Sequence, residues 1–306
     1  MVLQAAIEKW SGKIAEVTIG AANAAGVIKV GGQETLPFLF SEGKIPNAPR
    51  VAFEVWDVHP EDWPPELAAA WGENLKDPFA WAEACVNKYQ AQALCLRLQG
   101  AHPDYGNRSA ADEAKLAAGL AQKFGLPMIV IGCGDNELDN AMLPAVSEAL
   151  NGRQCLIGSA AQDNYKTLTA ACLADGHSII AESPIDINIA KQLNILISDM
   201  GLPLERIVID PTTGALGYGL EYAYSIMERA RLAALSGDKT VASPFICFVG
   251  HEVWKTKEAK VSPEQGVIWE AMTAAALLQA GADILVMRHP AAIEKVKQHI
   301  ENLMGK

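Results

Sequence analysis

The sequence predicts an eight-stranded (β/α)8 barrel, the TIM barrel, with an N-terminal hairpin extension. Short apolar runs alternate with longer segments of helical period, which is typical of repeated βα units. The runs are continuous rather than alternating, as in parallel strands buried on both faces. An open doubly wound sheet is the alternative architecture. The sequence favours the barrel, because eight units occur and no glycine-rich phosphate turn follows the first strand.

Each unit is placed by its apolar run and by the helix that follows it. We predict strands over 51–58, 93–98, 128–132, 155–158, 178–182, 207–210, 245–249 and 284–287. We predict helices over 78–88, 109–124, 138–150, 164–174, 186–200, 220–235, 263–280 and 291–303. Glycines just beyond several helices suit a left-handed C-cap: Gly125, Gly152, Gly176, Gly201 and Gly281.

The first fifty residues stand apart from this repeat. IAEVTIG and GVIKVGG predict a short hairpin, and a connection rich in proline and glycine follows it. We interpret 1–50 as an extension packed on the barrel, as a plug or flap, and 51–306 as the barrel itself. The two parts are expected to form one structural domain.

Composition and charge narrow the class of protein. A formal net charge of −11 argues against nucleic acid and anionic membranes as partners. The start, MVLQAAIEKWSGKIAE, has charges where a signal peptide is apolar, and no apolar window is long enough to span a bilayer. We therefore expect a soluble, cytoplasmic protein.

The cysteines are widely spaced and form no CxxC pair. Most lie inside apolar runs, where a free cysteine behaves as a small buried hydrophobe; only Cys133, in GCGD at a strand end, is a candidate to face a site. The pattern does not describe a disulfide framework, a zinc site or a protein-held iron–sulfur cluster. The six are Cys85, Cys95, Cys133, Cys155, Cys172 and Cys247.

Polar residues gather at the predicted carboxyl ends of the strands. In a barrel of this type, those ends build the functional site. The candidates in chain order are Asp57, His59, Arg97, Gln99, Cys133, Gly134, Asp135, Asn136, Ser159, Asn164, Glu182, Ser183, Asp210, Thr212, Thr213, Gly214, Gly250, His251, Glu252, Arg288 and His289.

Several candidates also have a simpler interpretation. Asp57 and Arg97 end neighbouring strands, so they either form a buried ion pair or contact a ligand. Asp57 and His59 fall short of the DxHxxG signature of a cobalamin-binding module, since Asp62 occupies the glycine position. His251 and Glu252 are either an acid–base pair or solvated loop residues.

The segment DPTTGALGYG is the most unusual in the chain. Asp210 ends a strand, and the glycines that follow allow close backbone approach to a ligand. Around it, the sequence has no GxSxG, no HExxH and no lysine in a predicted barrel strand. We therefore expect no catalytic residue, and the barrel is expected to present a binding surface.

Longer segments carry a family resemblance. GGQETLPF, ALCLRLQGAHPD, IVIGCGDNELD and DPTTGALGYG, in order from about residue 14 to the C-terminus, closely resemble the small subunit of the corrinoid iron–sulfur protein. The family that the segments resemble is also called the acetyl-CoA decarbonylase/synthase delta subunit family. Its implied fold is a barrel akin to those of pterin-dependent methyltransferases.

The resemblance implies a non-catalytic subunit of an anaerobic methyl-carrier complex. The chain would form a heterodimer with a large subunit that holds a cobamide and a 4Fe–4S cluster. In the reductive acetyl-CoA (Wood–Ljungdahl) pathway, cobalt would carry a methyl group from a methyltetrahydrofolate methyltransferase to acetyl-CoA synthase. The barrel would cap the cobamide and bind no metal or cluster itself. The residues expected at this cobamide are Asp57, Arg97, Gly134, Asp135, Ser159, Asn164, Glu182, Asp210, Thr212, Thr213, Gly214 and His251.

Two other functions remain open. A stand-alone methyltransferase would bind a reduced pterin at the same strand ends, where Asp57, Asp135, Asn136 and Asp210 are available. A metal-dependent lyase or aldolase would use Glu182, Asp210 and His251, but it leaves the segments shared with the corrinoid protein unexplained.

Overall fold

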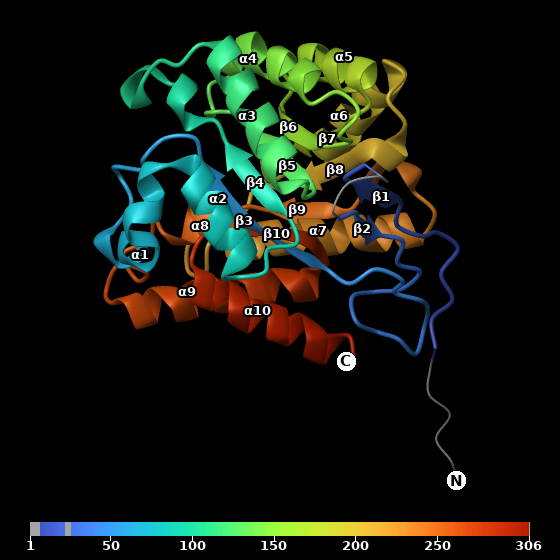
Figure 1. Ribbon diagram of the computed structural model, residues 1–306. Helices are drawn as coiled ribbons and strands as arrows, with labels where there is room; N and C mark the ends of the chain where they lie inside the picture. The colour runs from blue at the N-terminus through green and yellow to red at the C-terminus, as the bar shows by residue number, and fades with distance from the viewer. Residues whose placement is uncertain (1–6, 22–25, 306) are drawn as a thin grey trace.

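The computed structural model describes residues 7–21 and 26–305. Its centre is a closed parallel barrel with the strand order β10-β3-β4-β5-β6-β7-β8-β9, surrounded by helices (Figure 1). The predicted TIM barrel is confirmed. The strands are β3 (Arg50–Trp56), β4 (Leu94–Arg97), β5 (Met128–Ile131), β6 (Leu156–Ala160), β7 (Ser178–Glu182), β8 (Ile207–Asp210), β9 (Phe245–Cys247) and β10 (Ala282–Met287).

Each predicted helix is present, with ends within a few residues of those expected. The helices are α2 (Pro78–Asn87), α3 (Ala110–Phe124), α4 (Asn136–Ala149), α5 (Tyr165–Asp175), α6 (Ile187–Asp199), α7 (Leu220–Leu235), α9 (Pro263–Ala280) and α10 (Pro290–Leu303). Two further helices, α1 (Pro65–Trp71) and α8 (Val249–Val253), were not predicted. Seven and five residues give too little helical period to recognise. The predicted strand 245–249 therefore ends early, and its last residue begins α8.

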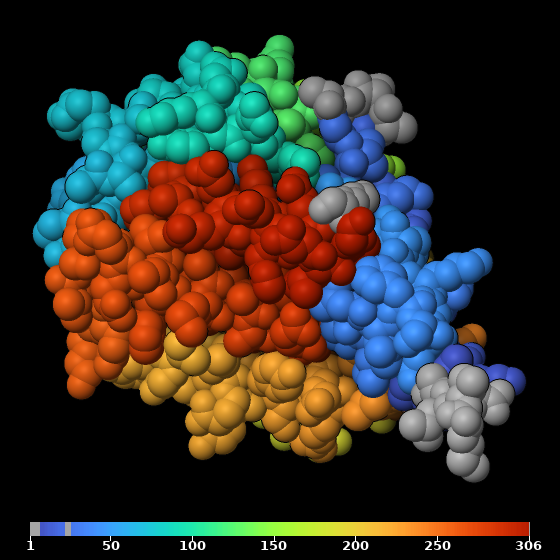
Figure 2. Space-filling model, turned by 90° about the horizontal axis from the view of Figure 1, so that it is seen from below, coloured from blue at the N-terminus to red at the C-terminus, as the bar shows by residue number. Residues whose placement is uncertain are grey.

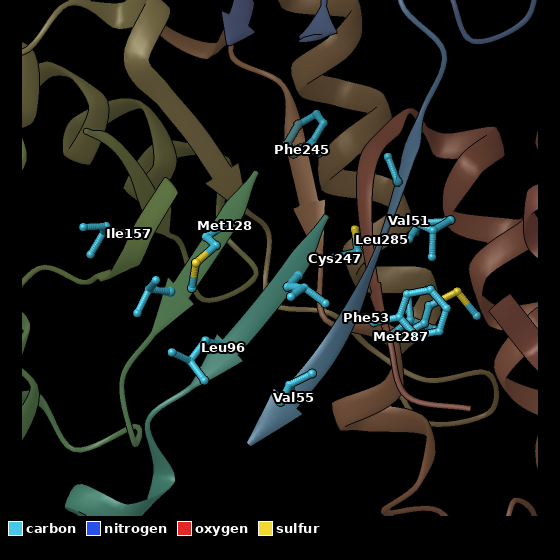
Figure 3. Packing of buried hydrophobic residues seen from close by; sticks show 14 of the residues in the cluster. Val51, Phe53, Val55, Leu96, Met128, Ile157, Phe245, Cys247, Leu285 and Met287 are labelled. Atoms are coloured by element: carbon cyan, nitrogen blue, oxygen red, sulfur yellow. The ribbon is translucent and has the colours of Figure 1, made fainter. Parts of the chain in front are cut away.

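Alternate residues of each barrel strand serve two different cores. Val51, Phe53 and Val55 of β3 pack outward among the helices, and Figure 3 shows this outer layer around the barrel. Ala52, between them, packs with the alternate residues of the other strands inside the barrel. Because successive side chains of a strand point to opposite faces, Glu54 shares the inward phase of Ala52. This phase places a charged residue inside the barrel.

The N-terminal hairpin closes one end of the barrel. It consists of β1 (Glu16–Ile19) and β2 (Ile28–Gly31), paired antiparallel. Residues 22–25 between them lie outside the described residues, as do 1–6 at the start of the segment that does not fit a signal peptide. The Gly20 N–H donates to the Gln154 carbonyl and the Ala15 N–H to that of Ala242, both shortly before barrel strands. The plug therefore lies at the amino ends of the strands. Four buried hairpin side chains join the core inside the barrel: Val17, Ile19, Ile28 and Val30.

A buried polar cluster ties the segment after the hairpin to the barrel base. The Asp283 carboxylate accepts from Gln33 Nε2 at 2.6 Å, from Arg231 Nη2 at 2.7 Å and from the Phe245 N–H at 2.9 Å. Both Asp283 and Arg231 are about 2% exposed or less, so each charge needs the other. Figure 2 shows the blue N-terminal segment beside the red C-terminal helix at this end.

Within the part of the chain that the structure describes, no helix is long and apolar enough to cross a membrane. The same residues contain no cluster of three or more histidine, cysteine or acidic side chains arranged to hold a metal ion.

The plug predicts a test of stability. Replacing Ile19 by alanine removes a fully buried side chain from the inner core and should lower the free energy of unfolding by about 2–5 kcal/mol. Val27, beside β2, is 40% exposed, and its replacement by alanine is the matched control. Urea denaturation followed by circular dichroism measures both. An equal, small loss in the two variants would show that the hairpin merely rests on the barrel.

Candidate functional site

A cavity of about 340 Å3 opens at the carboxyl ends of the strands, opposite the plug. It brings together eight of the residues predicted to contact a cofactor: Arg97, Gly134, Ser159, Glu182, Asp210, Thr212, Thr213 and His251. A larger hollow of about 980 Å3 lies at the other end, around 9–16 and 237–242. Its charged side chains are exposed or half-exposed and ordinarily solvated, so the smaller cavity is the candidate site.

The wall of the cavity is organised by Glu54, a residue that the strand-end search missed. Its carboxylate is fully buried, and four N–H groups reach it. Trp56 Nε1 and Arg97 Nε donate to Oε1 at 2.8 and 2.7 Å. Arg288 donates from Nη2 to Oε1 and from Nε to Oε2, both at 2.9 Å. Burial alone would raise the pKa of Glu54, but Arg288 and Arg97 outweigh it and hold that pKa well below its ordinary value.

Of the two interpretations left open for Asp57 and Arg97, the buried ion pair is not formed. Arg97 pairs with Glu54, while the Asp57 carboxylate accepts the Gly100 N–H with both oxygens at 3.0 Å. The chain leaves the barrel after β3, so Asp57 turns toward the next loop instead of across the mouth. It lies outside the cavity, beside Arg108 and Glu113. Burial, together with the nearby Asp57, raises the pKa of Glu113 to about 9.

Three other candidates support the loops around the cavity without lining it. Asp135 caps α4 by accepting the N–H groups of Glu137 and Leu138. Asn164 is buried and bridges its own loop, accepting from the Ala161 N–H at 2.6 Å and donating to the Ser159 carbonyl at 3.1 Å. At Gly214, a Cβ would lie 2.4 Å from the Gly219 backbone, so glycine lets the loop fold on itself.

Glu182 and Asp210 form the acidic floor of the cavity. They are paired residues at the carboxyl ends of adjacent strands β7 and β8. Burial, followed by the neighbouring Glu182, raises the pKa of Asp210 well above its ordinary value; burial also raises the pKa of Glu182. Two carboxyl groups so placed cannot both carry charge without a large cost. The pair therefore takes up protons more readily than isolated carboxyl groups do, and the oxygens of both residues face the cavity as hydrogen-bond acceptors.

The DPTTGALGYG segment connects this floor to the rim. The Thr212 N–H donates to Asp210 Oδ1 at 2.9 Å, and its hydroxyl donates to the Ser183 carbonyl at 3.1 Å. Thr212 has a φ of +62°, which is rare for a β-branched residue and strained. The Thr213 hydroxyl accepts the Phe248 N–H at 2.9 Å. Backbone strain of this kind is common at functional sites, so it supports the interpretation of this segment as part of the site.

Asp139 lines the cavity and is absent from the strand-end residues that the sequence predicted. It is 4% exposed and accepts the N–H groups of Cys133 at 2.8 Å and Gly134 at 3.2 Å. The sequence predicts a helix from 138, whereas α4 begins at Asn136. With Asp135 identified as the N-cap of α4, the helical period would have predicted that Asp139 points inward.

Cys133 does not offer a reactive thiolate. It is 9% exposed, and burial raises the pKa of its thiol to about 12. The thiol therefore stays protonated at neutral pH. The other cysteines are also free and buried, as the sequence predicted.

His251 and Glu252 follow β9 and both line the cavity. The two side chains are about a third exposed, so the site is open to solvent here. Burial, reinforced by Arg97 and Arg288, lowers the pKa of His251 well below its ordinary value. Glu252 pairs with Lys255 at 2.8 Å. The histidine is thus neutral at physiological pH, which disfavours a charged His–Glu pair.

Comparison with known proteins identifies the family. Residues 16–300 match the model of the CO dehydrogenase/acetyl-CoA synthase delta subunit. The chain belongs to this family. It is 31% identical to the acetyl-CoA decarbonylase/synthase complex subunit delta of Methanocaldococcus jannaschii, covering 95% of this chain and 74% of the relative. The subunit delta of Archaeoglobus fulgidus is 33% identical, with 98% and 70% covered.

Solved structures share the fold of this delta-subunit family member at low identity. A dihydropteroate synthetase described with a product superposes with a TM-score of 0.60 at 13% identity, covering 95% of this chain and all of that one. The dihydropteroate synthase of Yersinia pestis gives a TM-score of 0.55 at 15% identity, with 85% and 94% covered. At such identities the likeness shows the barrel fold alone.

Breaking the Glu54 cluster should destabilise the delta-family barrel. Glu54→Gln leaves two buried guanidinium groups without a carboxylate and should cost about 3–5 kcal/mol at pH 7. Because the folded pKa is depressed, the wild-type contribution is fully present above the unfolded pKa near 4.5 and is lost as pH falls through the folded value. Denaturation between pH 3 and 7 measures this. Glu73→Gln, at an exposed pair with Lys76, is the control and should change little.

On the acidic floor, ionised Asp210 is expected to lower the stability of the fold, whereas ionised Glu54 raises it. Asp210 has a raised folded pKa, so it costs stability as pH rises above the unfolded pKa near 3.8. Asp210→Asn should therefore be more stable than the wild type at pH 8, with a gap that closes toward pH 4. Exposed Asp163→Asn is the control. Thermal melts across this range check it, and a less stable Asp210→Asn variant at pH 8 would contradict a raised pKa of Asp210 in the folded protein.

Proposed function

We propose that this chain is the small subunit of a corrinoid iron–sulfur protein. In this proposal, it pairs with a large subunit that holds a cobamide and a 4Fe–4S cluster, and the carboxyl end of its barrel covers the cobamide. The observation that carries the proposal is the polar cavity at that end, in a barrel whose other end is plugged. Its relatives' names, as subunits of an acetyl-CoA decarbonylase/synthase complex, support a role within a protein assembly.

The size of the cavity limits how a corrinoid could sit. At about 340 Å3, it lies near the lower end of small-molecule sites, and a corrin macrocycle is too large to enter it. The ring would lie across the mouth, with one face and single edge groups directed inward. This geometry is that of a cap and agrees with a cobamide held mainly by another chain.

The lining fits the edge chemistry of a corrin, whose side chains are amides. An amide needs both a donor and an acceptor. Ser159 and Thr212 contribute hydroxyls, which can donate and accept, and Glu182 and Asp210 contribute carboxyl oxygens that accept. Arg97 is paired with Glu54, a carboxylate that it shares with Arg288. Other lining residues, Ile131 and Phe248, are apolar.

When bound, the cobamide supplies a cobalt centre that accepts and releases a methyl group. The residues of this chain would exclude water from that centre by closing over it and would orient the ring through its amides. In the proposed pathway, the methyl group comes from methyltetrahydrofolate through a separate methyltransferase and leaves to acetyl-CoA synthase. Each delivery requires the cap to open, because both proteins need access to the same face.

The alternative is a stand-alone methyltransferase that binds a reduced pterin. One observation favours it: Asn136, Asp139 and Asp210 converge in the cavity, and carboxyl and amide groups can grip the edge of a pterin ring. We prefer the cap because it also agrees with the family, whose members are named as subunits of a complex. The fold shared with dihydropteroate synthases does not decide between the two.

The cap predicts a separation of assembly from transfer. Thr212→Trp places a large ring at the cavity mouth and should slow methyl transfer from methyltetrahydrofolate by about tenfold to a hundredfold. The complex with the large subunit should still elute intact in size-exclusion chromatography. Asn151→Trp, exposed before β6 at the plugged end, is the control and should transfer at the wild-type rate.

Two outcomes would count against this proposal. An unchanged transfer rate in Thr212→Trp would remove the cavity mouth from the methyl-carrier function. Tight calorimetric binding of methyltetrahydrofolate by the isolated chain, with methyl transfer to free cobalamin, would instead establish the stand-alone methyltransferase.

A further inference from the structure

The hydrogen bond between Arg288 and His251 fixes the tautomer of a residue in the cavity wall. His251 Nδ1 lies 2.9 Å from Arg288 Nη2. A guanidinium has only N–H donors, so Nδ1 must be the acceptor. The neutral imidazole then carries its own proton on Nε2.

Arg288 is itself held in place by two contacts. Its Nη2 carries two protons, and the second one goes to Glu54 Oε1 at 2.9 Å, while Nε donates to Oε2. The guanidinium also lies over the Trp63 ring, 4.8 Å from its centroid. At Gly250, a Cβ would come within 2.6 Å of Arg288 Cγ, so the absence of a side chain lets α8 approach. Glu54 and Gly250 thus set the position of the donor that faces His251.

The surroundings keep this ring neutral and its Nε2–H available. The groups that act on it are the cations Arg97, Arg288 and Lys255 and the anions Glu54 and Glu252. Glu252 Oε1 lies 3.7 Å from Nε2, beyond hydrogen-bonding distance, and is paired with Lys255. Among the described residues, no group accepts a hydrogen bond from Nε2. That nitrogen is also not enclosed, because His251 lines the cavity and is partly exposed.

We infer that Glu54 and Arg288 are positioning residues that fix His251 as an Nε2–H donor to an uncharged carbonyl oxygen of the cavity's ligand. The inference rests on the proposed function, because the carboxyl-end cavity must receive a ligand group. Acidic side chains dominate the charge of the cavity lining: Asp139, Glu182, Asp210 and Glu252 lie there with one guanidinium, Arg97, which already donates to Glu54. An anionic oxygen is therefore disfavoured. A carboxamide suits both sides: its oxygen accepts from His251, and its N–H groups can donate to the acidic floor.

Two sources could supply such a group. One is an amide arm of a corrinoid, and the other is the lactam edge of a pterin, which presents the same carbonyl and N–H pattern. The chemistry at His251 is shared between them, so the binding experiment below compares both.

The tautomer is tested directly by long-range 1H–15N correlation spectroscopy on the full chain with 15N-labelled histidine. One ring should appear as the neutral Nε2–H form throughout pH 5.5–8.5 and should be absent from His251→Gln. Arg288→Met should convert His251 to a mixture of tautomers, and Arg288→Lys, which keeps a donor, should restore the wild-type pattern. Lys255→Met is the control and should leave the tautomer unchanged. A protonated or Nδ1–H ring for His251 in the wild type, which needs no variant to fold, would overturn the inference.

Ligand class is tested by titrating the same sample with propionamide and, separately, with propionate. Propionamide should shift the His251 Nε2 resonance, and propionate of equal shape should not; a shift with propionate alone would overturn the inference. Dicyanocobinamide and tetrahydropterin then separate the two sources. A His251 response to tetrahydropterin alone would support the donor role while contradicting the corrinoid cap. A response to dicyanocobinamide supports both.

Discussion

The carboxyl half of the barrel depends on one buried carboxylate. Glu54 accepts N–H groups from β3, from the end of β4 and from the residue after β10, so it joins three neighbouring strands at the seam where the barrel closes. The two guanidinium groups that pair with this carboxylate lie in different parts of the site. Arg97 lines the cavity, and Arg288 reaches α8. A buried ion cluster of this kind gives little net stability over an apolar core, but it fixes positions.

The two ends of the barrel have opposite roles. At the amino ends, the hairpin contributes aliphatic side chains to the interior, and the Asp283–Arg231 pair joins the chain to the base. At the carboxyl ends, the interior positions become polar, and the cavity begins where the aliphatic layers stop. The amino ends hold the aliphatic hairpin core and a buried ion pair, and the carboxyl ends hold the strained Thr212 and carboxyl groups whose pKa is raised by burial. This division is typical of the fold.

The resemblance and the ring of strand-end residues could be predicted because both are local in the sequence. Asp210, Glu182 and Arg97 end strands, so parallel strands of matched length bring them to one rim. Glu54 escaped the search because it lies inside a strand, where only the inward phase of the closed barrel gives it meaning. Asp57 lies outside the cavity because the direction in which the chain leaves β3 is set by the 99–108 loop.

The sequence by itself determined the barrel, the order of its elements, the burial of the cysteines and the family. These follow from short-range period, composition and long matching segments. Only the tertiary structure decided which charges pair, where the hairpin plugs and which carboxyl groups have a raised pKa. Those properties depend on distances between residues remote in the chain and on how much water each pair loses, and neither quantity is encoded by spacing along the sequence.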